Sequence, residues 1–424
     1  MGSGPEGGAK VAGLRGGPFV VVMNWIQFGR LIHSIYRRGG PLPDLDWIES
    51  LGLLAVKLGQ VHALRIDFLE REKCEHLARL YRRNASLPAQ DFRELLRAST
   101  GPDFFSHFKS IADQALASAS VGQVHRGRLI TGEEVVIKAV KRNVRAQFTA
   151  DVASLRRLFR LAMFCYPKLR QVGNPLGILG DLEEYTLSEL DLRREVAGQR
   201  TLRVIQARAD DFDLTRLTFA RVYEDLSNEN VMVSDFVPGK TFDELLEAGA
   251  LDYADLLELF RIHGYYMFCV GTFHGDMHPG NVLLSQGKLC FIDTGFVGRV
   301  GRKIRRGLYD FFVALSEYDY PKCAAALNRM SGIELTGMAY TAFEKQFLAL
   351  YANFAGATVS EVSLTRQMMQ TIKLGVHAGM EFEKGIFAII RSLMYLDGMV
   401  LRCRPDAVLL RDMRPFIAEF QERV

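Results

Sequence analysis

The sequence carries its clearest chemical signal in residues 274–281, which read His-Gly-Asp-Met-His-Pro-Gly-Asn, and in the Ile-Asp-Thr-Gly that follows at 292–295. Within these segments Asp276, Asn281 and Asp293 stand in the order Asp, Asn, Asp of a kinase catalytic loop and metal site. Phosphoryl transfer needs a carboxylate that accepts or orients the proton of the nucleophile, and oxygen ligands that hold a divalent metal on the phosphates. The spacing therefore predicts phosphoryl-transfer chemistry.

Two histidines in the same segment, His274 and His278, stand at i and i+4 and could suggest a metal site instead. Zinc sites need three or four ligands, whereas here a proline follows His278 directly and no third ligand is in place. We interpret His274 as a residue that braces the loop.

A second signal lies upstream, where Val-Val-Ile-Lys at 135–138 reads as a buried strand ending on a lysine. A lysine at this position can reach the α and β phosphates of a nucleotide. The hairpin before it carries Ala-Ser-Ala-Ser-Val-Gly-Gln at 117–123, where a kinase has its glycine-rich loop. Small side chains still let the backbone approach phosphate, although Ala and Ser are stiffer than Gly. The expected nucleotide-binding residues are Lys138 with Ala117, Ser118, Ala119, Ser120 and Val121.

The lysine needs an acidic partner on a helix, and the segment 189–195 (Glu-Leu-Asp-Leu-Arg-Arg-Glu) offers three acids. In a regular helix Asp191 and Glu195 share a face, because they are four residues apart. Glu189 would point about 120° away from Glu195. Two acids that face different directions suggest two separate tasks.

The elements that must position these residues follow from periodicity and from the Gly and Pro residues that interrupt it. Helical spacing predicts helices over 21–38, over 45–64, onward to about 97 with a break at Pro88, and over 146–207 with an interruption between Pro167 and Pro175. Strand patterns cover 120–129, 135–140, 217–223 and 231–236, followed by a hinge at 237–239. Beyond the hinge the chain reads as helical except for the cluster at 274–295.

Composition sets the broad class. The 424 residues are 48% hydrophobic, which excludes disorder and a disulfide scaffold, and the formal net charge of +4 gives no reason to expect nucleic acid as a partner. No apolar run approaches the roughly 20 residues that span a bilayer. The six cysteines have no Cys-x-x-Cys spacing, which fits reduced thiols in a cytoplasmic compartment. Gly2 is followed by Glu6 rather than the Ser or Thr of a myristoylation signal, so residues 1–18 read as a loose tail.

Together with Lys-Leu-Gly-Gln at 57–60, these motifs resemble the UbiB/AarF-like atypical kinases, a family of ubiquinone-biosynthesis accessory proteins. The marks of that family are a KxGQ helix before the kinase core, an Ala-rich loop, an ExD acid pair and an HxDxHPGN catalytic loop. All four occur here in this order, and the resemblance extends from about Trp47 to the C-terminus.

The resemblance implies an α+β, protein-kinase-like fold of two lobes, with a small antiparallel-sheet N-lobe, a helical C-lobe and a helical N-terminal extension. It implies ATP and Mg²⁺ as cofactors. We expect a tail over 1–18, the extension over 19–110, the N-lobe with a helical insertion over 111–237 and the C-lobe over 238–424. By this resemblance, Lys138 is the phosphate lysine and Glu195 is its helix partner, while Glu189 and Asp191 are the ExD acids. Asp276 is the catalytic base, and Asn281 and Asp293 are the metal ligands. Lys57 and Gln60 are a regulatory pair that lies over the site.

Two departures from the family are expected to matter. The usual Asp-Phe-Gly is Asp-Thr-Gly at 293–295, so the aromatic residue that packs behind the metal ligand is replaced by Thr294. The C-terminal pair of membrane helices seen in some bacterial members is absent from this sequence. Contact with a membrane surface is then expected to be peripheral, through the amphipathic segment 21–38 or an apolar patch near the lid formed by Lys57 and Gln60. For the segment 21–38 itself, a helix docked on the core is favoured over a basic helix on an anionic membrane.

Three functions fit the sequence. The first is an ATP-binding, Mg²⁺-dependent kinase or ATPase that supports isoprenoid quinone or other lipid metabolism, with a prenyl-quinone-type lipid or a small molecule as acceptor. The second is a small-molecule phosphotransferase of the aminoglycoside or choline kinase type, which would not need the motif at 57–60 or the Ala-rich loop. The third is a catalytically silent, nucleotide-gated lipid-binding protein.

Overall fold

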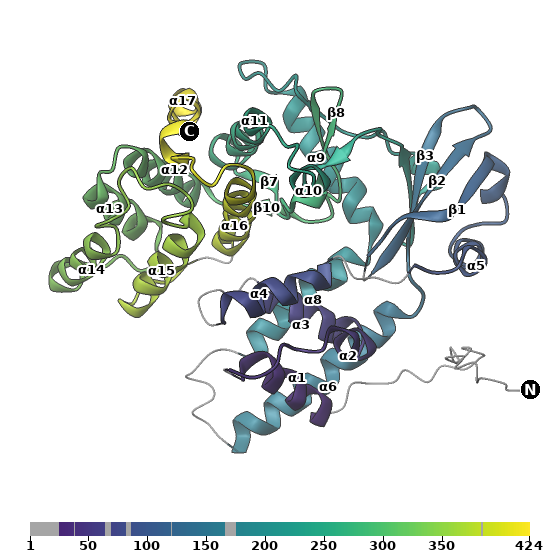
Figure 1. Ribbon diagram of the computed structural model, residues 1–424, viewed down its shortest axis with the longest axis horizontal. Coiled ribbons are helices and arrows are strands. Elements are labelled where there is room, and N and C mark those ends of the chain that lie inside the picture. Colours follow the sequence, from purple (N-terminus) through teal and green to yellow (C-terminus); the bar gives the residue numbers. More distant parts are fainter. Residues whose placement is uncertain are drawn as a thin grey trace, which may run out of the picture.

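The structure is a computed structural model that describes residues 25–37, 39–63, 69–81, 86–119, 121–165, 175–382 and 385–424. The expected tail, the first residues of the expected helix over 21–38 and the loop residue Ser120 lie outside the described residues. Figure 1 shows a twisted sheet on one side, a helical lobe on the other and a separate group of helices, formed by the start of the chain and its first long helices, below both.

The helical N-terminal extension has its own hydrophobic core. Its helices are α1 (Trp25–Tyr36), α2 (Leu45–Ser50), α3 (Leu53–Ala63) and α4 (Arg71–Ala78). They pack on two helices inserted later in the sequence, α6 (Val144–Cys165) and α8 (Pro175–Glu189), with Leu31, Leu54, Leu77, Phe148 and Leu182 in the shared core. Segments more than 100 residues apart in sequence therefore form one helical unit.

The single helix expected over 45–64 is wrong, because the chain forms two helices. Leu51 and Gly52 separate α2 from α3, and Gly52 has a φ of +98°. This backbone conformation is easily adopted only by glycine and cannot continue a right-handed helix. The turn sets the direction of α3, which carries Lys57 and Gln60.

The N-lobe is a four-stranded antiparallel sheet of order β1-β2-β3-β5. Its strands are β1 (Phe108–Ser118), β2 (Gly122–Leu129), β3 (Glu134–Val140) and β5 (Val231–Asp235), and α5 (Ala89–Ser99) packs Phe92 and Leu96 against it. The predicted hairpin over 120–140 and the strand over 231–236 match β2, β3 and β5. The long β1 was not predicted; it pairs with β2 through register shifts and is largely exposed, so it has no regular alternation of apolar residues.

The helical insertion after β3 continues with α9 (Leu192–Ala207), so the described residues of the region predicted as helical over 146–207 form α6, α8 and α9. The strand expected over 217–223 is shorter, since β4 contains only Leu217 and Thr218. After it the chain follows irregular backbone to a single bridge between Val222 and Ser234.

The C-lobe is mainly helical, as expected. Two small sheets, of order β4-β9-β8-β6 and β10-β7, lie at the start of the lobe near α9 and α10, as Figure 1 shows. The strands are β6 (Lys240–Thr241), β7 (Thr272–His274), β8 (Val282–Ser285), β9 (Lys288–Phe291) and β10 (Val297–Arg299). The helices are α10 (Phe242–Glu247), α11 (Tyr253–Gly264) with a π-helical end (Tyr265–Val270), α12 (Arg302–Ser316), α13 (Tyr320–Met330), α14 (Gly337–Leu350), α15 (Leu364–His377), α16 (Gly385–Cys403) and α17 (Leu409–Glu419).

Short 3₁₀ turns complete the secondary structure at Arg79–Tyr81, Phe104–His107, Glu224–Leu226, Pro279–Asn281 and Gln421–Arg423. Among the described residues, no helix combines the length and apolar composition needed to cross a bilayer.

Candidate functional site

The centre of the site is a lysine held between two carboxylates. Lys138 Nζ lies 2.6 Å from Glu195 Oε2 and 3.3 Å from Asp293 Oδ2. The lysine comes from β3, where it pairs with Val124 and Met232, and Glu195 comes from the first turns of α9. The structure thus brings together three of the predicted site residues, one from the N-lobe, one from the insertion and one from the C-lobe.

The charges of Lys138, Glu195 and Asp293 shift one another's pKa values. Burial acts to lower the pKa of Lys138, but the Asp293 and Glu195 carboxylates outweigh it and raise this pKa above its usual value. Burial raises the pKa of Glu195, against the opposing effect of Lys138. The pKa of Asp293 is lowered: burial acts to raise it, but Lys138 and other nearby cations outweigh that effect. The lowered pKa keeps Asp293 ionised, and half of its side-chain surface is exposed, so a metal ion would be able to reach it.

The helix that carries Glu195 is fastened directly to the segment that carries Asp293. Thr294 Oγ1 donates a hydrogen bond of 2.8 Å to the Glu195 carbonyl. A Cβ atom on Gly198 would lie only 2.0 Å from the Thr294 carbonyl oxygen, so α9 and this segment approach as closely as backbones can. Asp293 itself has a φ of +52°, a left-handed conformation that is uncommon outside glycine.

The loop 274–281, the candidate catalytic loop, is held in place by its own histidine. His274 Nε2 lies 2.9 Å from the Ile292 carbonyl, and the backbone N–H of Asp276 donates to His274 Nδ1 at 3.2 Å. Asn281 Nδ2 donates to the Asp276 backbone carbonyl at 3.0 Å and to Asp276 Oδ2 at 3.2 Å. The bracing role predicted for His274 is confirmed. The Asn281 amide nitrogen thus orients Asp276, and its amide oxygen would be the atom to hold a cation.

The donor atoms fit Mg²⁺ with a nucleotide. Mg²⁺ is usually held by one or two protein oxygens, with waters and phosphates completing its coordination. Asp293 and Asn281 would supply these oxygens, and Lys138 would supply a cation for phosphate. Among the described residues, no cluster of three His, Cys, Asp or Glu side chains has the geometry of a metal-binding site.

The loop expected to cover the nucleotide is a turn between β1 and β2. Ala117 and Ser118 end β1, while the Ala119 N–H donates to the Gly122 carbonyl at 2.8 Å. Val121 is buried in the core that the extension shares, and its backbone carbonyl accepts a hydrogen bond of 2.9 Å from the Lys141 N–H. Lys141, which sequence reasoning missed, donates from Nζ to the Ala119 carbonyl at 3.0 Å.

The predicted regulatory residues lie where the extension meets the site. Lys57 is buried and forms an ion pair with Glu189, and its charge contributes to the lowered pKa of Asp293. Gln60 is also buried, and its Nε2 donates to the Leu80 carbonyl at 3.1 Å. Lys57 therefore faces the site, whereas the recorded bond of Gln60 stays inside the extension.

The expected arrangement of the three acids at 189–195 is wrong, because this segment is not one helix. α8 ends at Glu189 and α9 begins at Leu192, so Asp191 is the N-cap of α9. Its carboxylate accepts hydrogen bonds from Arg193, whose Nε and Nη2 lie 2.9 Å from it, and these bonds lower the pKa of Asp191. Asp191 thus caps the helix that presents Glu195, while Glu189 reaches Lys57.

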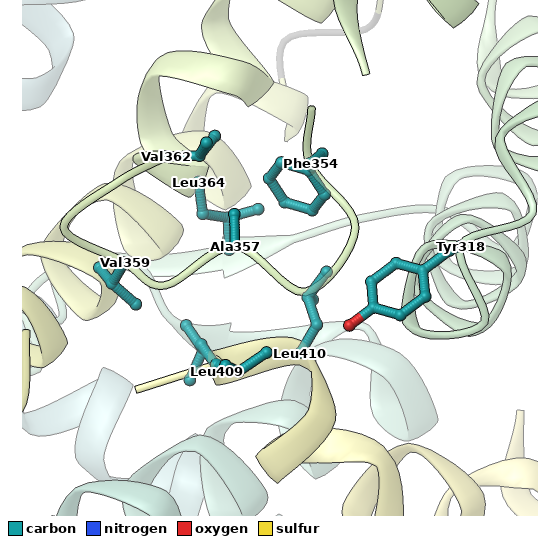
Figure 2. Close-up of a pocket in the computed structure, with 9 residues that line it drawn as sticks. Tyr318, Phe354, Ala357, Val359, Val362, Leu364, Leu409 and Leu410 are labelled. Carbon is teal, nitrogen blue, oxygen red and sulfur yellow. The ribbon is translucent and has the colours of Figure 1, made fainter. Parts of the chain in front are cut away.

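A small apolar pocket occurs in the C-lobe, as Figure 2 shows. It measures about 20 Å³, contains none of the site residues and is lined by Tyr318, Phe354, Val359, Leu364 and Leu410 among others. A cavity of this size holds roughly one water molecule, so it has no room for a nucleotide or a lipid chain.

The two lobes, the Lys138–Glu195 pair and the acids of the catalytic loop define an α+β protein of the protein-kinase-like class. Comparison with protein families narrows this class. Residues 79–327 match the model of the ABC1 atypical kinase-like domain, and the chain belongs to this family. The resemblance to UbiB/AarF-like kinases is thereby confirmed.

Similar proteins agree with this assignment. The chain is 27% identical over 387 residues to the "Probable protein kinase UbiB" of Actinobacillus pleuropneumoniae serotype 5b, covering 87% of this chain and 69% of that protein. It is 27% identical over 384 residues to the protein of the same name from Vibrio vulnificus, covering 88% and 69%. A solved structure titled "The complex structure of Rv3197-erythromycin from Mycobacterium tuberculosis" covers 90% of each chain with a TM-score of 0.55 and 20% identity, which shows a shared fold.

Proposed function

We propose that this protein binds Mg²⁺-ATP and uses it for phosphoryl transfer or ATP hydrolysis. The observation that carries the proposal is the Lys138–Glu195 pair at 2.6 Å with Asp293 beside it, because a lysine that is to bind phosphate and a carboxylate that is to hold the metal must lie this close together. This group joins residues that are far apart in sequence. An ion pair with a purely structural role would need only Lys138 and Glu195, and it would not require a third, half-exposed carboxylate such as Asp293.

Each residue has a distinct task in this proposal. Lys138 binds the α and β phosphates, and Asn281 and Asp293 hold the Mg²⁺ that offsets the charge of the phosphates. Asp276, oriented by Asn281, accepts or directs the proton of the attacking hydroxyl or water. The backbone of the loop 117–121 covers the nucleotide.

The acceptor is proposed to be water, a small molecule or a lipid rather than a large protein. Lys57 and Glu189 join the extension to the insertion beside the site and restrict the approach of a bulky substrate. A role in isoprenoid quinone or related lipid metabolism, with a prenyl-quinone-type compound as partner, is supported by the name UbiB that the similar proteins carry.

Peripheral contact with a membrane surface is part of the proposal. The end of α6 exposes Phe164 and Leu161 with Arg157 and Arg160 on one helical face, and α1, which packs on α6 through Phe28 and Phe159, exposes Ile26. Apolar side chains next to arginines suit the boundary between anionic headgroups and acyl chains.

The test measures ATP consumption by the purified protein with and without anionic liposomes and prenylphenol-like compounds. Thermal unfolding with and without Mg²⁺-ATP gives an independent measure of binding. We expect stabilisation that requires Mg²⁺ and is lost in Asp293→Asn, while the exposed control Asp406→Asn retains it. Absence of any shift in the wild type at millimolar Mg²⁺-ATP would refute the proposal, and a shift without turnover under any condition would favour a nucleotide-gated binding protein.

A further inference from the structure

Tyr185 lies where four separate segments of the chain meet. It belongs to α8, and its ring makes an edge-to-face contact with Phe296 at a centroid distance of 5.6 Å. The Arg391 guanidinium of α16 lies 4.7 Å from the Tyr185 ring centre, and the Lys57 ammonium of α3 lies 5.5 Å from it. One tyrosine ring therefore contacts the extension, the C-terminal helices and the segment after Asp293.

Two of these neighbours are fastened to the residue directly before Asp276. Arg391 Nη2 donates a hydrogen bond of 2.7 Å to the Gly275 carbonyl, and the Gly275 N–H donates to the Phe296 carbonyl at 2.8 Å. A Cβ atom on Gly275 would lie 2.2 Å from the Phe296 ring, so these groups leave no spare space. The Tyr185 ring therefore rests on two side chains, Phe296 and Arg391, whose residues bind the backbone of Gly275 directly before Asp276.

The other contact of the ring leads to the extension. Tyr185 and Glu189 stand four residues apart on α8 and share one face, and Lys57 contacts both. Burial raises the pKa of Tyr185 well above its usual value, and Asp276 and Glu189 raise it further. The hydroxyl therefore stays protonated at neutral pH within the field of the Asp276 carboxylate.

We propose that Tyr185 is a positioning residue that couples the helical extension to the catalytic loop and closes the acceptor side of Asp276. While the ring stays between Lys57, Arg391 and Phe296, α3 is held against the loop and a bulky acceptor is excluded. An acceptor gains access when the ring leaves this position, and Lys57 and the catalytic loop are released together. Only the acceptor part of this inference rests on the proposed function.

Hydrogen exchange on the full chain without nucleotide tests the coupling. Tyr185→Ala is expected to speed exchange about tenfold in both 53–63 and 272–281, which corresponds to the loss of about 1.4 kcal/mol of ring contacts. Tyr185→Phe keeps the ring and should leave both segments unchanged. Tyr340→Ala, at a similarly half-buried tyrosine of α14, is the control for general destabilisation and should also leave both unchanged.

The inference is overturned if Tyr185→Ala loosens neither segment or only one of them, or if Tyr340→Ala loosens both equally. A second readout is autophosphorylation with Mg²⁺-ATP, whose rate should rise several-fold in Tyr185→Ala while the KM for ATP stays unchanged. If the variant shows the exchange effect but its autophosphorylation rate is unchanged, Tyr185 does not close the acceptor side. If the wild type fails to bind Mg²⁺-ATP, the proposed function fails while the exchange result still decides the coupling.

Discussion

Gly198 offers a sharp test of how closely the Glu195 helix is attached to the segment that carries Asp293. A Cβ atom at this position would lie 2.0 Å from the Thr294 carbonyl oxygen and 3.0 Å from a methyl group of Val297. Unstrained carbon–oxygen contacts are about 3.3 Å or longer, so Gly198→Ala must move the helix and the segment apart by more than about 1 Å.

The size of the effect follows from three contributions. Replacing glycine by alanine inside a helix favours the folded state by about 1 kcal/mol. Overpacking against a fixed neighbour costs about 1–3 kcal/mol. The shift also breaks the bond from Thr294 Oγ1 to the Glu195 carbonyl, worth about 1 kcal/mol, and stretches the Lys138–Glu195 pair. We expect a net destabilisation of about 1–3 kcal/mol.

The assay is chemical unfolding of the purified protein, followed by Mg²⁺-ATP titration. Gly180→Ala on α8 is a matched control, because a Cβ atom there meets nothing within 4 Å and the change should stabilise by up to about 1 kcal/mol. Gly198→Ala should also bind Mg²⁺-ATP at least tenfold more weakly, because a loss of about 1.4 kcal/mol corresponds to that factor. If Gly198→Ala is as stable as Gly180→Ala and binds nucleotide normally, the close attachment of α9 does not form the site.

Three further predictions concern single side chains. Lys57→Met should raise autophosphorylation, since it removes the ion pair with Glu189, and unchanged labelling would show that α3 does not restrict the site. Burial lowers the pKa of His263 to about 3. Protonation of this histidine in the unfolded chain should therefore lower the free energy of unfolding by on the order of 2 kcal/mol between pH 7 and 5. In urea unfolding, His263→Phe should flatten this pH dependence, whereas the exposed control His107→Gln should not. Asp191→Ala should destabilise by about 1 kcal/mol through loss of the α9 cap, and no change would contradict the capping role.

The sign of the His263 effect follows from linkage. A histidine whose pKa is lowered on folding binds a proton in the unfolded chain first, so stability is complete above the unfolded pKa of about 6.5 and falls as the pH drops towards 3. Neither ring nitrogen of His263 has a hydrogen-bond partner in the described structure, and its ring packs edge-on against Phe273 at 5.7 Å. Phenylalanine can fill this space without a group that must be protonated.

The parts of the site that could be predicted from the sequence lie within short segments. The loop 274–281 and the Asp-Thr-Gly at 293–295 are joined by the short paired strands β8 and β9. Because this pairing brings the two segments together, the order of residues alone indicated that their side chains would meet. Lys138 could be predicted for a similar reason, because it lies on a strand whose apolar pattern is regular and whose residues are largely buried. The two-lobed fold followed from the same motifs.

The parts that could not be predicted depend on backbone breaks and on distant contacts. The turn at Gly52 and the cap at Asp191 interrupt helical periodicity that the apolar residues continue across, so the pattern gave one helix where there are two. The contact between Tyr185 and Arg391 joins α8 to α16, and neither residue belongs to a motif. A tyrosine or an arginine on a helix is ordinary in sequence, and only the packing shows that Arg391 binds the Gly275 carbonyl and that Tyr185 lies against Arg391.

The replacement of the usual phenylalanine by Thr294 changes how the site can be controlled. A phenylalanine holds its segment by apolar packing that can be withdrawn, whereas Thr294 is fully buried and hydrogen-bonded to the Glu195 carbonyl. The next aromatic residue, Phe296, packs instead under Tyr185 and Arg391. Thr294 therefore ties the segment that carries Asp293 to the helix that carries Glu195, and the aromatic contact is made with Tyr185 of α8 and Arg391 of α16. We expect regulation to act through the extension and α8, because the apolar and aromatic contacts next to the site are made there rather than behind Asp293.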